Sequence, residues 1–564
     1  MKNIKKIYKI IDIEFKLKVL FLFLFTVILT GLEILSLGSI PILIGNILNN
    51  KIDFLEIDFF SEMISKYNLV QISGAVILLF FLKSLFVLFF NYYLFNFNFK
   101  LSIFLSNKIY KNYIYSEYLS TIKIKTSDIL RNLTTEVSNF ISCLNNSIQI
   151  LRDITISFSI ILLIILFLDK YLFIIFLIFL ILSILFYSLI KDFLKRKGEQ
   201  TIKLRSDYLA TINDSFKLLK EIIIGNKRDF FVNKFISKLK IAENNNFKSY
   251  FIFSSGRVVF ELFAVTMLIG LIIYMFNKDY SNSYIISYVS LVGVAAIRVM
   301  PLFNSILTNL NKIQYKKYSI NVIWDLLNFT NIKLEKDKIL PNSINFNNLI
   351  TINDLDFKID EKQILNNINL KIKKGEKISI VGPSGSGKTT LINIISGLYK
   401  NESGEFKIDD FIINNNSHIK LREIVSYMPQ ESHLINDSII NNIILNIQVN
   451  NEDYKNVLKI TNLENLINKL DKGINEEVSQ DGSNISGGEK QRIILSRSLA
   501  RRFEILILDE PFSSLDQNNS YEILNNIFSE YSNKTIIVVS HKVDERLKFD
   551  KTFIIENGNL KIDT

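Results

Sequence analysis

The first 328 residues alternate between long apolar runs and charged stretches. Each apolar run approaches the ~20 residues that a helix needs to cross a bilayer. The six runs are Leu17–Leu48, Leu69–Phe95, Ile154–Leu168, Tyr171–Ile190, Phe251–Phe276 and Tyr284–Leu307. Only Asp169 and Lys170 separate the third run from the fourth, which predicts a tight turn there. The pattern therefore predicts an all-α domain with six membrane-spanning helices.

The pattern changes in the second half of the chain. Residues 329–348 are polar, contain Pro341 and are typical of a linker. From residue 349 onward, short β-rich runs alternate with helical stretches, as they do in α/β domains. We therefore divide the chain into a transmembrane domain at residues 1–328, a linker at 329–348 and an α/β domain at 349–564.

Charge predicts how the helices are oriented. Lys and Arg crowd the N-terminus and residues 100–131, 191–248 and 312–317, so these segments are expected in the cytoplasm. Residues 49–68 are acidic and are expected on the other side. Apolar residues recur there at helical spacing, which predicts either an amphipathic helix on the outer bilayer surface or an external cap. These residues are Ile52, Leu55, Phe59 and Met63.

Composition agrees with a chain that is partly solvated by lipid. Hydrophobic residues make up 49%, Phe alone numbers 45, and charged residues are only 21%. We attribute the net charge of +11 to cytoplasmic loops and expect no nucleic-acid partner. The single cysteine, Cys143, allows neither an intrachain disulfide nor a cysteine metal cluster, and we expect a buried thiol. The basic Met1–Lys18 leads into a run too long for a signal peptide, so we expect no cleavable one.

One stretch in the α/β domain has the pattern G-x-x-x-x-G-K-[ST] of a phosphate-binding loop. Its residues are Gly382, Pro383, Ser384, Gly385, Ser386, Gly387, Lys388, Thr389 and Thr390. An apolar run that predicts a strand, Lys377–Val381, precedes it, and a predicted helix begins at Leu391. The loop and the helix N-terminus would surround an anion with N–H groups, Lys388 would add a cation, and Thr389 would ligate Mg²⁺. The alternative is a glycine-rich turn with an unrelated lysine.

A second apolar strand, Ile505–Leu508, ends in two carboxylates, Asp509 and Glu510. A strand that delivers a carboxylate beside a phosphate loop suits Mg²⁺ binding, largely through water, by Asp509. Glu510 could then polarise the attacking water as general base. The pair alone is a weak signal, but after a phosphate loop it is a strong one.

Together with these motifs, the sequence resembles an ABC exporter half-transporter, in which membrane and nucleotide-binding domains are fused. The segment Tyr427–Gln430 resembles the Q-loop, whose Gln430 would contact Mg²⁺ and sense the membrane domain. Ser513–Asp516 resembles the D-loop, and His541 resembles the switch histidine that contacts the γ-phosphate. His418 and His433 match no motif, and we expect them at the surface.

The family signature is similar to residues 484–492. The resemblance implies that Ser486, Gly487 and Gly488 offer a hydroxyl, amides and a helix N-terminus to the γ-phosphate on a second subunit. Substitutions relative to the usual pattern are Ile485 for Leu, Glu489 for Gln and, further upstream, Gln480 for Glu. The aromatic that usually stacks on adenine falls on Ile359, and Phe357 is the nearby candidate.

The resemblance also implies an assembly. Lys388, Gln430, Glu510 and His541 are all present, so two copies of the chain would build two complete ATP sites. We therefore expect a homodimer in the inner (cytoplasmic) membrane with its ATPase domains in the cytoplasm, and a heterodimer is the alternative. Coupling helices are expected around residues 113–119 and 220–227.

Short matches in the membrane half resemble flippases for polyprenyl-diphosphate-linked oligosaccharides. They are Glu33 with Pro41, Arg257–Glu261 and Arg298–Pro301, although Gly256 and Ile297 replace the family's usual Pro and Tyr. This predicts export or flipping of a lipid-linked substrate. Drug, lipid or peptide export by the same architecture is the alternative. A soluble ABC ATPase and an ATP-gated channel are different classes, and the six apolar runs argue against the first.

Three cations in the apolar runs are candidates for substrate binding: Arg257, Arg298 and Lys83. A charge at the centre of a bilayer costs ~2.5–3.5 kcal/mol, so these side chains should face protein or water. Guanidinium groups match the paired oxygens of a diphosphate. The alternative is that all three pair with carboxylates such as Glu33 and Glu261 and only hold the helices in register.

Overall fold

The computed structural model of the chain describes residues 2–47, 69–167, 170–278, 282–328, 344–401, 403–414, 417–447, 451–479, 484–540 and 546–563. Some helical side chains also lie outside this description, among them that of Arg298. The chain forms two compact units. The first is Met1–Ser116 with Ser120–Leu334, and the second is Glu117–Leu119 with Glu335–Thr564. Each unit is described by itself.

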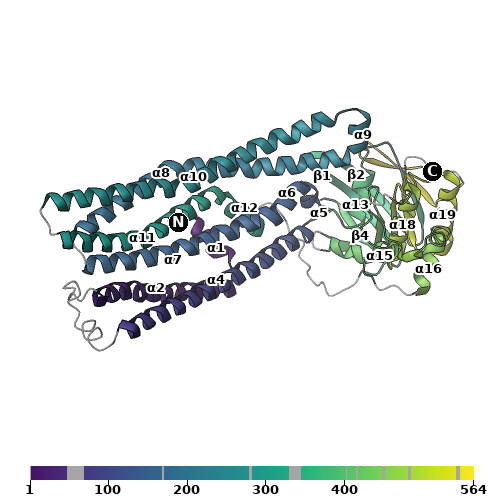
Figure 1. The fold of residues 1–564 in the computed structure, drawn as a ribbon. Helices are drawn as coiled ribbons and strands as arrows, with labels where there is room; N and C mark the ends of the chain where they lie inside the picture. Colours follow the sequence, from purple (N-terminus) through teal and green to yellow (C-terminus); the bar gives the residue numbers. More distant parts are fainter. Residues whose placement is uncertain are drawn as a thin grey trace. The chain divides into compact units, whose positions relative to one another are not determined.

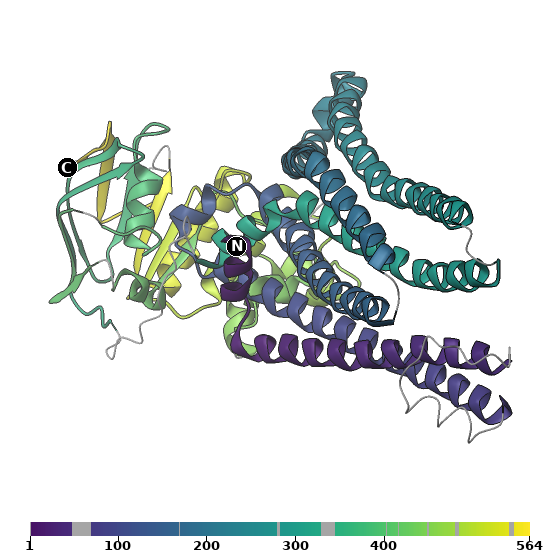
Figure 2. The same cartoon turned by 90° about the vertical axis from the view of Figure 1, so that its left-hand side faces the viewer.

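The first unit is helical (Figures 1 and 2). Its long helices are α2 (Ile13–Ile47), α4 (Leu69–Ile114), α7 (Val137–Phe167), α8 (Lys170–Lys217), α10 (Arg228–Asn277) and α11 (Asn282–Lys316). Its shorter elements are α1 (Lys2–Ile10), α5 (Tyr118–Ile122), α6 (Thr126–Arg131), the π-helical turn η1 (Asn132–Glu136), α9 (Leu219–Ile224) and α12 (Tyr318–Asn328), although the first two residues of α5 group with the second unit. Each predicted apolar run falls on a different long helix, and all of these helices except α2 continue well beyond their runs.

By length and composition, two stretches of the described residues qualify as membrane spans. They are Ile13–Ser36 and Leu69–Ile114, each with a mean hydropathy of 2.4. The other long helices include residues whose side chains lie outside the description. The predicted external segment, residues 49–68, lies outside it entirely.

Helix α4 shows how the first unit is packed. Its buried side chains recur every three or four residues and therefore share one face. They are Phe90, Leu94, Phe97, Leu101, Leu105, Ile109 and Tyr113. This stripe packs against Phe15, Phe140 and Ile323 in one cluster. On the opposite side Phe81 and Leu88 are 59% and 65% exposed, as expected of a helix that meets lipid.

One glycine sets the approach of two long helices. Gly198 of α8 lies so close to α11 that an added Cβ would be 1.8 Å from the carbonyl oxygen of Tyr315. Only glycine fits there without moving a backbone. Nearby, the Tyr315 hydroxyl donates to Oδ1 of Asn246 in α10 at 2.6 Å and lies 3.1 Å from the Thr201 hydroxyl, so polar contacts join the three helices. The buried thiol expected at Cys143 is confirmed, since this residue is 0% exposed.

The second unit contains two sheets. A four-stranded antiparallel sheet has the order β2-β1-β4-β5, and a six-stranded sheet has the order β10-β9-β3-β8-β7-β6. Pairing is parallel from β9 through β6, and β10 adds an antiparallel edge. The strands are β1 (Leu349–Ile359), β2 (Lys362–Lys373), β3 (Lys377–Val381), β4 (Glu405–Ile408), β5 (Phe411–Ile413), β6 (Val425–Met428), β7 (Ile505–Asp509), β8 (Thr535–Ser540), β9 (Lys551–Glu556) and β10 (Asn559–Asp563).

The helices of this unit are mostly short. They are α13 (Lys388–Ile395), η2 (His418–Lys420), α14 (Leu421–Ile424), α15 (Ile439–Ile444), α16 (Asn451–Ile460), α17 (Glu464–Ile467), η3 (Gly473–Asn475), α18 (Gly487–Leu499) and α19 (Gln517–Glu530). The strands predicted at Lys377–Val381 and Ile505–Leu508 are confirmed as β3 and β7. The α/β fold predicted from residue 349 onward is also confirmed.

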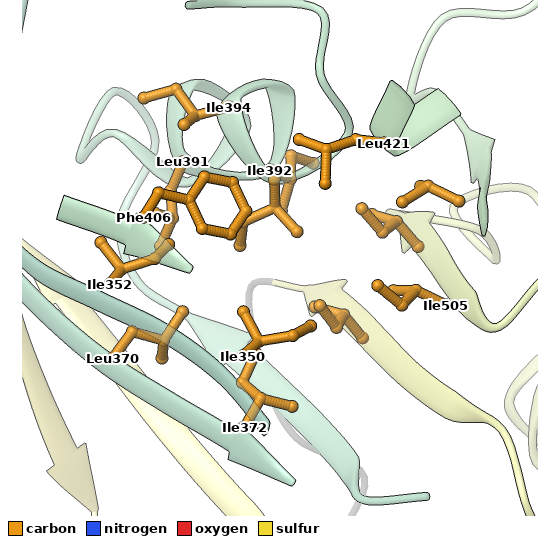
Figure 3. Close-up of a cluster of buried hydrophobic side chains, with 14 of the residues drawn as sticks. Ile350, Ile352, Leu370, Ile372, Leu391, Ile392, Ile394, Phe406, Leu421 and Ile505 are labelled. Atoms are coloured by element: carbon orange, nitrogen blue, oxygen red, sulfur yellow. The ribbon is translucent and has the colours of Figure 1, made fainter. Parts of the chain in front are cut away.

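The central strands are apolar without a break because both of their faces are buried. In β7, Ile505 and Ile507 face one core, while Leu506 and Leu508 face a second core with α18 and α19. Figure 3 shows the first core, where Ile350 and Leu370 of the antiparallel sheet point toward α13 and β4.

The two histidines outside the motifs differ in exposure, and the last part of the expected linker is packed. His418 is 2% exposed, so the expected surface position is wrong, whereas His433 is exposed as expected. Residues 329–343 of the expected linker lie outside the described residues. Its last part is packed, because Ile344 and Phe346 are 4% and 2% exposed and join the first core.

Candidate functional site

The candidate site lies where the parallel strands of the six-stranded sheet end. The loop 382–387 follows β3, Gln430 follows β6, and Asp509 closes β7. Because β8 separates β3 from β7, the phosphate loop and the two carboxylates meet across one strand. Crevices at the carboxyl ends of parallel strands are where open α/β sheets bind ligands.

The loop glycines adopt a backbone that other residues avoid. The φ angles are 155° at Gly382, 77° at Gly385 and 109° at Gly387. A Cβ on Gly382 would also lie 2.2 Å from the carbonyl oxygen of Ile555. Gly387 is the N-cap of α13, so the loop turns directly into a helix N-terminus. This geometry exposes N–H groups to an anion, as the sequence pattern predicts.

The side chains of the loop divide into a buried and an exposed set. Lys388 is 6% exposed, and its Nζ donates to the carbonyl oxygens of Gly382 at 2.7 Å and Pro383 at 3.0 Å, which holds the cation inside the loop. Ser386 is 5% exposed, and its Oγ has no hydrogen-bond partner among the described residues. The exposed set is Pro383, Ser384, Gly385 and Thr389, and Thr390 is half-buried.

Asp509 is a buried carboxylate beside this loop. Its side chain is 2% exposed, and the Tyr427 hydroxyl donates to its Oδ2 at 3.3 Å. Burial, and then the negative charge of Glu510, raise the pKa of Asp509 to about 6, while Lys388 and a hydrogen bond from Thr389 act in the opposite direction. Burial and the neighbouring Asp509 also raise the pKa of Tyr427, so its hydroxyl stays a donor.

Glu510 has an unusual backbone for its residue type. Its φ is 48°, in the left-handed region, and its N–H donates to the carbonyl oxygen of Val539 in β8 at 2.9 Å. Such strained positions in non-glycine residues cluster at functional sites. The Nε2 of Gln430 donates to Glu510 Oε2 at 2.7 Å. The structure therefore brings together Glu510 and Gln430, two of the three residues expected in catalysis, while the third, His541, lies outside the described residues.

The signature segment forms the start of α18. Ser486 is its N-cap and accepts from the N–H of Glu489 at 3.3 Å, while Glu489 Oε2 accepts from the N–H of Ser486 at 2.8 Å. This reciprocal capping box gives the substituted Glu489 a structural reason. Glu489 also places a carboxylate in the first turn, where its negative charge interacts favourably with the positive end of the helix dipole.

Sequence reasoning missed the residue that joins the signature to the D-loop. Gln491 donates from Nε2 to Ser513 Oγ at 2.6 Å and accepts the N–H of Ser514 at 3.0 Å. A Cβ on Gly488 would lie 2.8 Å from the side chain of Leu515, so the two motifs pack closely. Gln491 lies within the signature at residues 484–492, but nothing in the sequence spacing indicates that it contacts Ser513 and Ser514 of the D-loop.

The expected adenine contact of Phe357 remains an untested prediction, and its burial argues against it. Phe357 is 3% exposed, and its ring stacks on Tyr399 with centroids 5.4 Å apart and planes 6° apart. Phe357 lies two residues after Leu355 and shares its buried face, while an irregularity around Asp354, whose φ is 49°, shifts that face relative to Ile352. Ile359 is only partly buried.

The three candidate substrate cations have different surroundings. Lys83 pairs with Glu33 at 2.5 Å, and both side chains are 12% exposed. Arg257 lies 3.9 Å from Glu261, and both are well exposed, at 75% and 63%. Arg298 belongs to α11, but its side chain lies outside the described residues. His541 and Gln480 also lie outside them.

ATP fits the residues of the phosphate loop. The glycines with positive φ and the enclosed Lys388 form a cradle of hydrogen-bond donors. The Ser386 hydroxyl, which has no partner among the described residues, is free to bind a phosphate oxygen there. For Mg²⁺, Thr389 and Asp509 offer one hydroxyl and one carboxylate, which suits an ion that keeps several waters and binds phosphate. No cluster of three or more His, Cys, Asp or Glu that could hold a metal occurs among the described residues. When bound, Mg²⁺ would neutralise charge that develops on the phosphates.

Comparisons with known proteins agree with this site. Residues 365–513 match the family model described as ABC transporter. An export ATP-binding/permease protein of Rickettsia felis is 27% identical over 566 residues, which cover 94% of this chain and 92% of the relative. An ATP-dependent lipid A-core flippase of Francisella tularensis is 27% identical over 384 residues, which cover 67% and 62% of the two chains.

A solved structure has the same fold over nearly the whole chain. It is a bacterial Atm1-family ABC exporter with ATP bound, with a TM-score of 0.80 at 17% identity, and the match covers 97% of this chain and 95% of that one. The motifs, the sheet order and the family match therefore agree. The chain therefore has the architecture of an ABC half-transporter, in which a helical transmembrane domain precedes an ABC ATPase domain that couples ATP hydrolysis to transport.

Proposed function

We propose that this half-transporter acts as a homodimer in the cytoplasmic membrane and flips a lipid-linked substrate whose head group is attached through a diphosphate. The most concrete candidate is a polyprenyl-diphosphate-linked oligosaccharide. The ATP sites would combine the loop 382–390 of one copy with Ser486, Gly487 and Gly488 of the other. Glu510 would act as general base, with Gln430 and His541 beside it.

The observation that carries the substrate proposal is the ion pair between α2 and α4. Glu33 and Lys83 lie in helices apolar enough to span a membrane, and Lys83 Nζ also donates to Ser36 Oγ at 3.3 Å. Charged residues in spans are costly, and well-packed apolar residues often replace a buried pair without loss of stability. We therefore infer that the charges of Glu33 and Lys83 serve the function of the protein and not only its stability. An incoming diphosphate can take the place of the Glu33 carboxylate at Lys83.

Two further observations support an anionic lipid-linked substrate. The pair between Arg257 and Glu261 is long and exposed, which leaves the Arg257 guanidinium accessible to a second acceptor. Forked guanidinium donors match two phosphate oxygens at once, and we assign the same role to Arg298. The similarity to lipid A-core flippases supports a lipid as cargo.

A second candidate function is export of a drug, lipid or peptide without a diphosphate. It is favoured by the carboxylate partners of Lys83 and Arg257, because paired cations can serve only to hold helices together. The two candidate functions predict different translocation when a cation is removed together with its carboxylate partner, because only a purely structural pair can be removed as a whole without loss of transport.

The test is ATP-driven translocation in proteoliposomes that contain a lipid-linked oligosaccharide diphosphate, with a fluorescent drug in parallel. The variants are Lys83→Met, Glu33→Gln with Lys83→Met, and Arg257→Gln with Arg298→Gln. Lys195→Met is the matched control, because Lys195 lies 4.0 Å from Glu199 on the surface of α8. Basal ATPase in each variant reports whether the protein is folded.

The proposal expects the Lys83 and arginine variants to lose translocation of the diphosphate lipid by at least about tenfold and to keep basal ATPase. The double variant of Glu33 and Lys83 should not recover translocation, because the substrate contact is still missing. Recovery in that double variant would mean that the pair is only structural. Persistent transport in the arginine double variant would remove the case for a diphosphate.

A further inference from the structure

We propose that the junction of α1 and α2 binds the head group of an anionic phospholipid from the cytoplasmic leaflet. This inference rests on the membrane fold and not on the proposed substrate. The junction lies between the basic helix α1 and the apolar stretch Ile13–Ser36 that begins α2 and is long enough to span a membrane. A lipid phosphate lies at this depth in a bilayer.

A cavity of about 480 Å³ opens at this junction. It is lined by Lys9 at the end of α1, by residues 11–16 of the connection and first turn of α2, and by Phe104 of α4. Pockets for small ligands begin at roughly 300 Å³, so a phosphate with its glycerol fits this volume. Two of the lining residues are well packed, because Ile11 and Phe15 are only 5% and 6% exposed.

The charges around the cavity leave two lysines for a ligand. The carboxylates that line it already face cations: Asp12 lies 3.6 Å from Lys108, and Glu14 pairs with Lys18. Lys9 has no carboxylate partner among the described residues, and Lys16 Nζ sits 4.0 Å from the ring centroid of Tyr8. Two ammonium groups on one rim attract a phosphate diester, and each lysine near an anionic leaflet contributes to binding.

The apolar surface beside the cavity favours a lipid over a free phosphate. Ile13 is 75% exposed at the rim, and Leu17 and Leu20 continue the exposed face of α2 at 54% and 56%. Tyr8 is 64% exposed on the α1 side, where an aromatic ring suits the interface between head groups and tails. A phospholipid can therefore place its phosphate at Lys9 and Lys16 and its acyl chains along α2.

The experiment compares lipid retention by the purified full-length protein in native mass spectrometry. The protein is delipidated and offered equal amounts of phosphatidylglycerol and phosphatidylcholine with the same acyl chains. Lys9→Ala with Lys16→Ala removes the two cations, and Lys9→Arg with Lys16→Arg keeps the charge. Lys217→Ala with Lys240→Ala is the control, because both lysines are exposed on the cytoplasmic helix extensions. ATPase activity in detergent reports folding.

The proposal expects the parent, the arginine variant and the control to prefer phosphatidylglycerol by about tenfold or more. The double alanine variant should bind the two lipids nearly equally and keep its ATPase activity. An unchanged preference in that variant would overturn the site, and so would an equal loss in the control, since general surface charge would then explain the binding. Competition by glycerophosphoglycerol, which has no acyl chains, at the same concentration would show a free phosphate ester site instead of a lipid site.

Discussion

Two ways of holding a charge can be compared in the two units. In the ATPase unit, backbone groups surround Lys377: its ammonium, which has three N–H groups, lies 3.1, 2.9, 3.1 and 2.5 Å from the carbonyl oxygens of Gly375, Tyr531, Ser532 and Lys534. Ion pairs such as Lys534 with Glu504 also occur in this unit. In the transmembrane unit, three cations are paired with carboxylates. The pairs are Lys83 with Glu33, Arg152 with Asp153, and Arg257 with Glu261.

This difference has a consequence for function. A charge that is held by several backbone groups can lose its partners only if the fold itself moves, so it fixes geometry. A charge that is held by one side chain can exchange that partner for a ligand when either rotamer changes. The ATPase unit thus holds Lys377 in a fixed position, while the proposed substrate would compete for the cations of the transmembrane unit.

The largest effect is expected from Glu510→Gln. The amide keeps the shape of the side chain and its contact with Gln430, but it cannot accept a proton from the attacking water. Loss of a general base lowers rates by 10²–10⁴-fold, so we expect ATP hydrolysis to fall by roughly 10³-fold while ATP binding persists. Steady-state ATPase and nucleotide retention measure the two properties.

The control for this prediction is Glu489→Gln, because a glutamine oxygen can still accept the N–H of Ser486 and keep the capping box of α18. It should keep most of the hydrolysis rate. A Glu510→Gln protein that turns over ATP near the parental rate would show that Glu510 is not the base, and the functional contrast between the units would lose its strongest support.

The next effect is expected from Lys388→Ala. This substitution removes the enclosed cation that the carbonyl oxygens of Gly382 and Pro383 orient. Removal of one preorganised electrostatic group costs about 10²–10³-fold in rate, and we expect hydrolysis or ATP affinity to fall by at least ~10²-fold. Lys371→Ala, at an exposed position of β2, is the control. Unchanged turnover would rule out the proposed role of Lys388.

The ATPase motifs could be read from the sequence because their chemistry dictates residues at fixed spacing. The pattern of glycines and Lys388 after an apolar strand predicts a phosphate loop, and β3 confirms the strand. The apolar β7 likewise predicted a strand that ends in Asp509. The transmembrane helices could be read only as spans, because lipid accepts apolar residues on every side and sequence alone does not reveal which face packs.

Contacts between distant residues could not be predicted. Glu33 and Lys83 lie on different helices, and no spacing rule links them. Three of the four carbonyl oxygens around Lys377 come from a turn more than a hundred residues further along the chain, so the neighbouring sequence does not indicate its role. The burial of Phe357 does not follow from simple alternation, because continuing the pattern of Ile350 and Ile352 would place Phe357 outward. The irregularity around Asp354 reverses the faces of the strand, and nothing in the sequence pattern indicated it.

A smaller effect, on stability, is expected from Lys377→Met. The lysine is 8% exposed, and its loss removes the ammonium that lies among four carbonyl oxygens, of which only that of Tyr531 keeps a backbone donor among the described residues, the N–H of Lys534. We expect the ATPase unit to lose ~2–3 kcal/mol of unfolding free energy, which thermal or urea unfolding of the full chain would detect. Lys83→Met should cost less, because the Glu33 side chain can change its rotamer when its partner is lost, whereas the carbonyl oxygens around Lys377 are fixed by the backbone. If both variants lose the same stability, the contrast between backbone-held and side-chain-held charges is wrong.

The smallest effect concerns Asp409, which receives the N–H groups of Asn347, Asn348 and Leu349 at 2.7, 2.8 and 2.7 Å. Burial would raise the pKa of Asp409, but these three donors and the charge of Lys374 hold it below the ordinary value of 3.8. Asp409→Asn removes the charge and keeps one acceptor oxygen. We expect a loss of about 1–2 kcal/mol at neutral pH, measured as the unfolding difference between parent and variant.

The pH dependence of that difference tests its cause. A carboxylate whose folded pKa is depressed stabilises the protein fully above its unfolded pKa, here the ordinary 3.8, and loses this contribution as pH falls through the lower folded value. The difference between parent and Asp409→Asn should therefore stay constant from pH 7 down to about 4.5 and shrink below that. Asp410→Asn, at the exposed neighbouring position, should show little difference at any pH. A gap between parent and Asp409→Asn that widens in acid would mean that the three N–H groups do not favour the charged carboxylate, and Asp409 would not belong with the backbone-held charges of the ATPase unit.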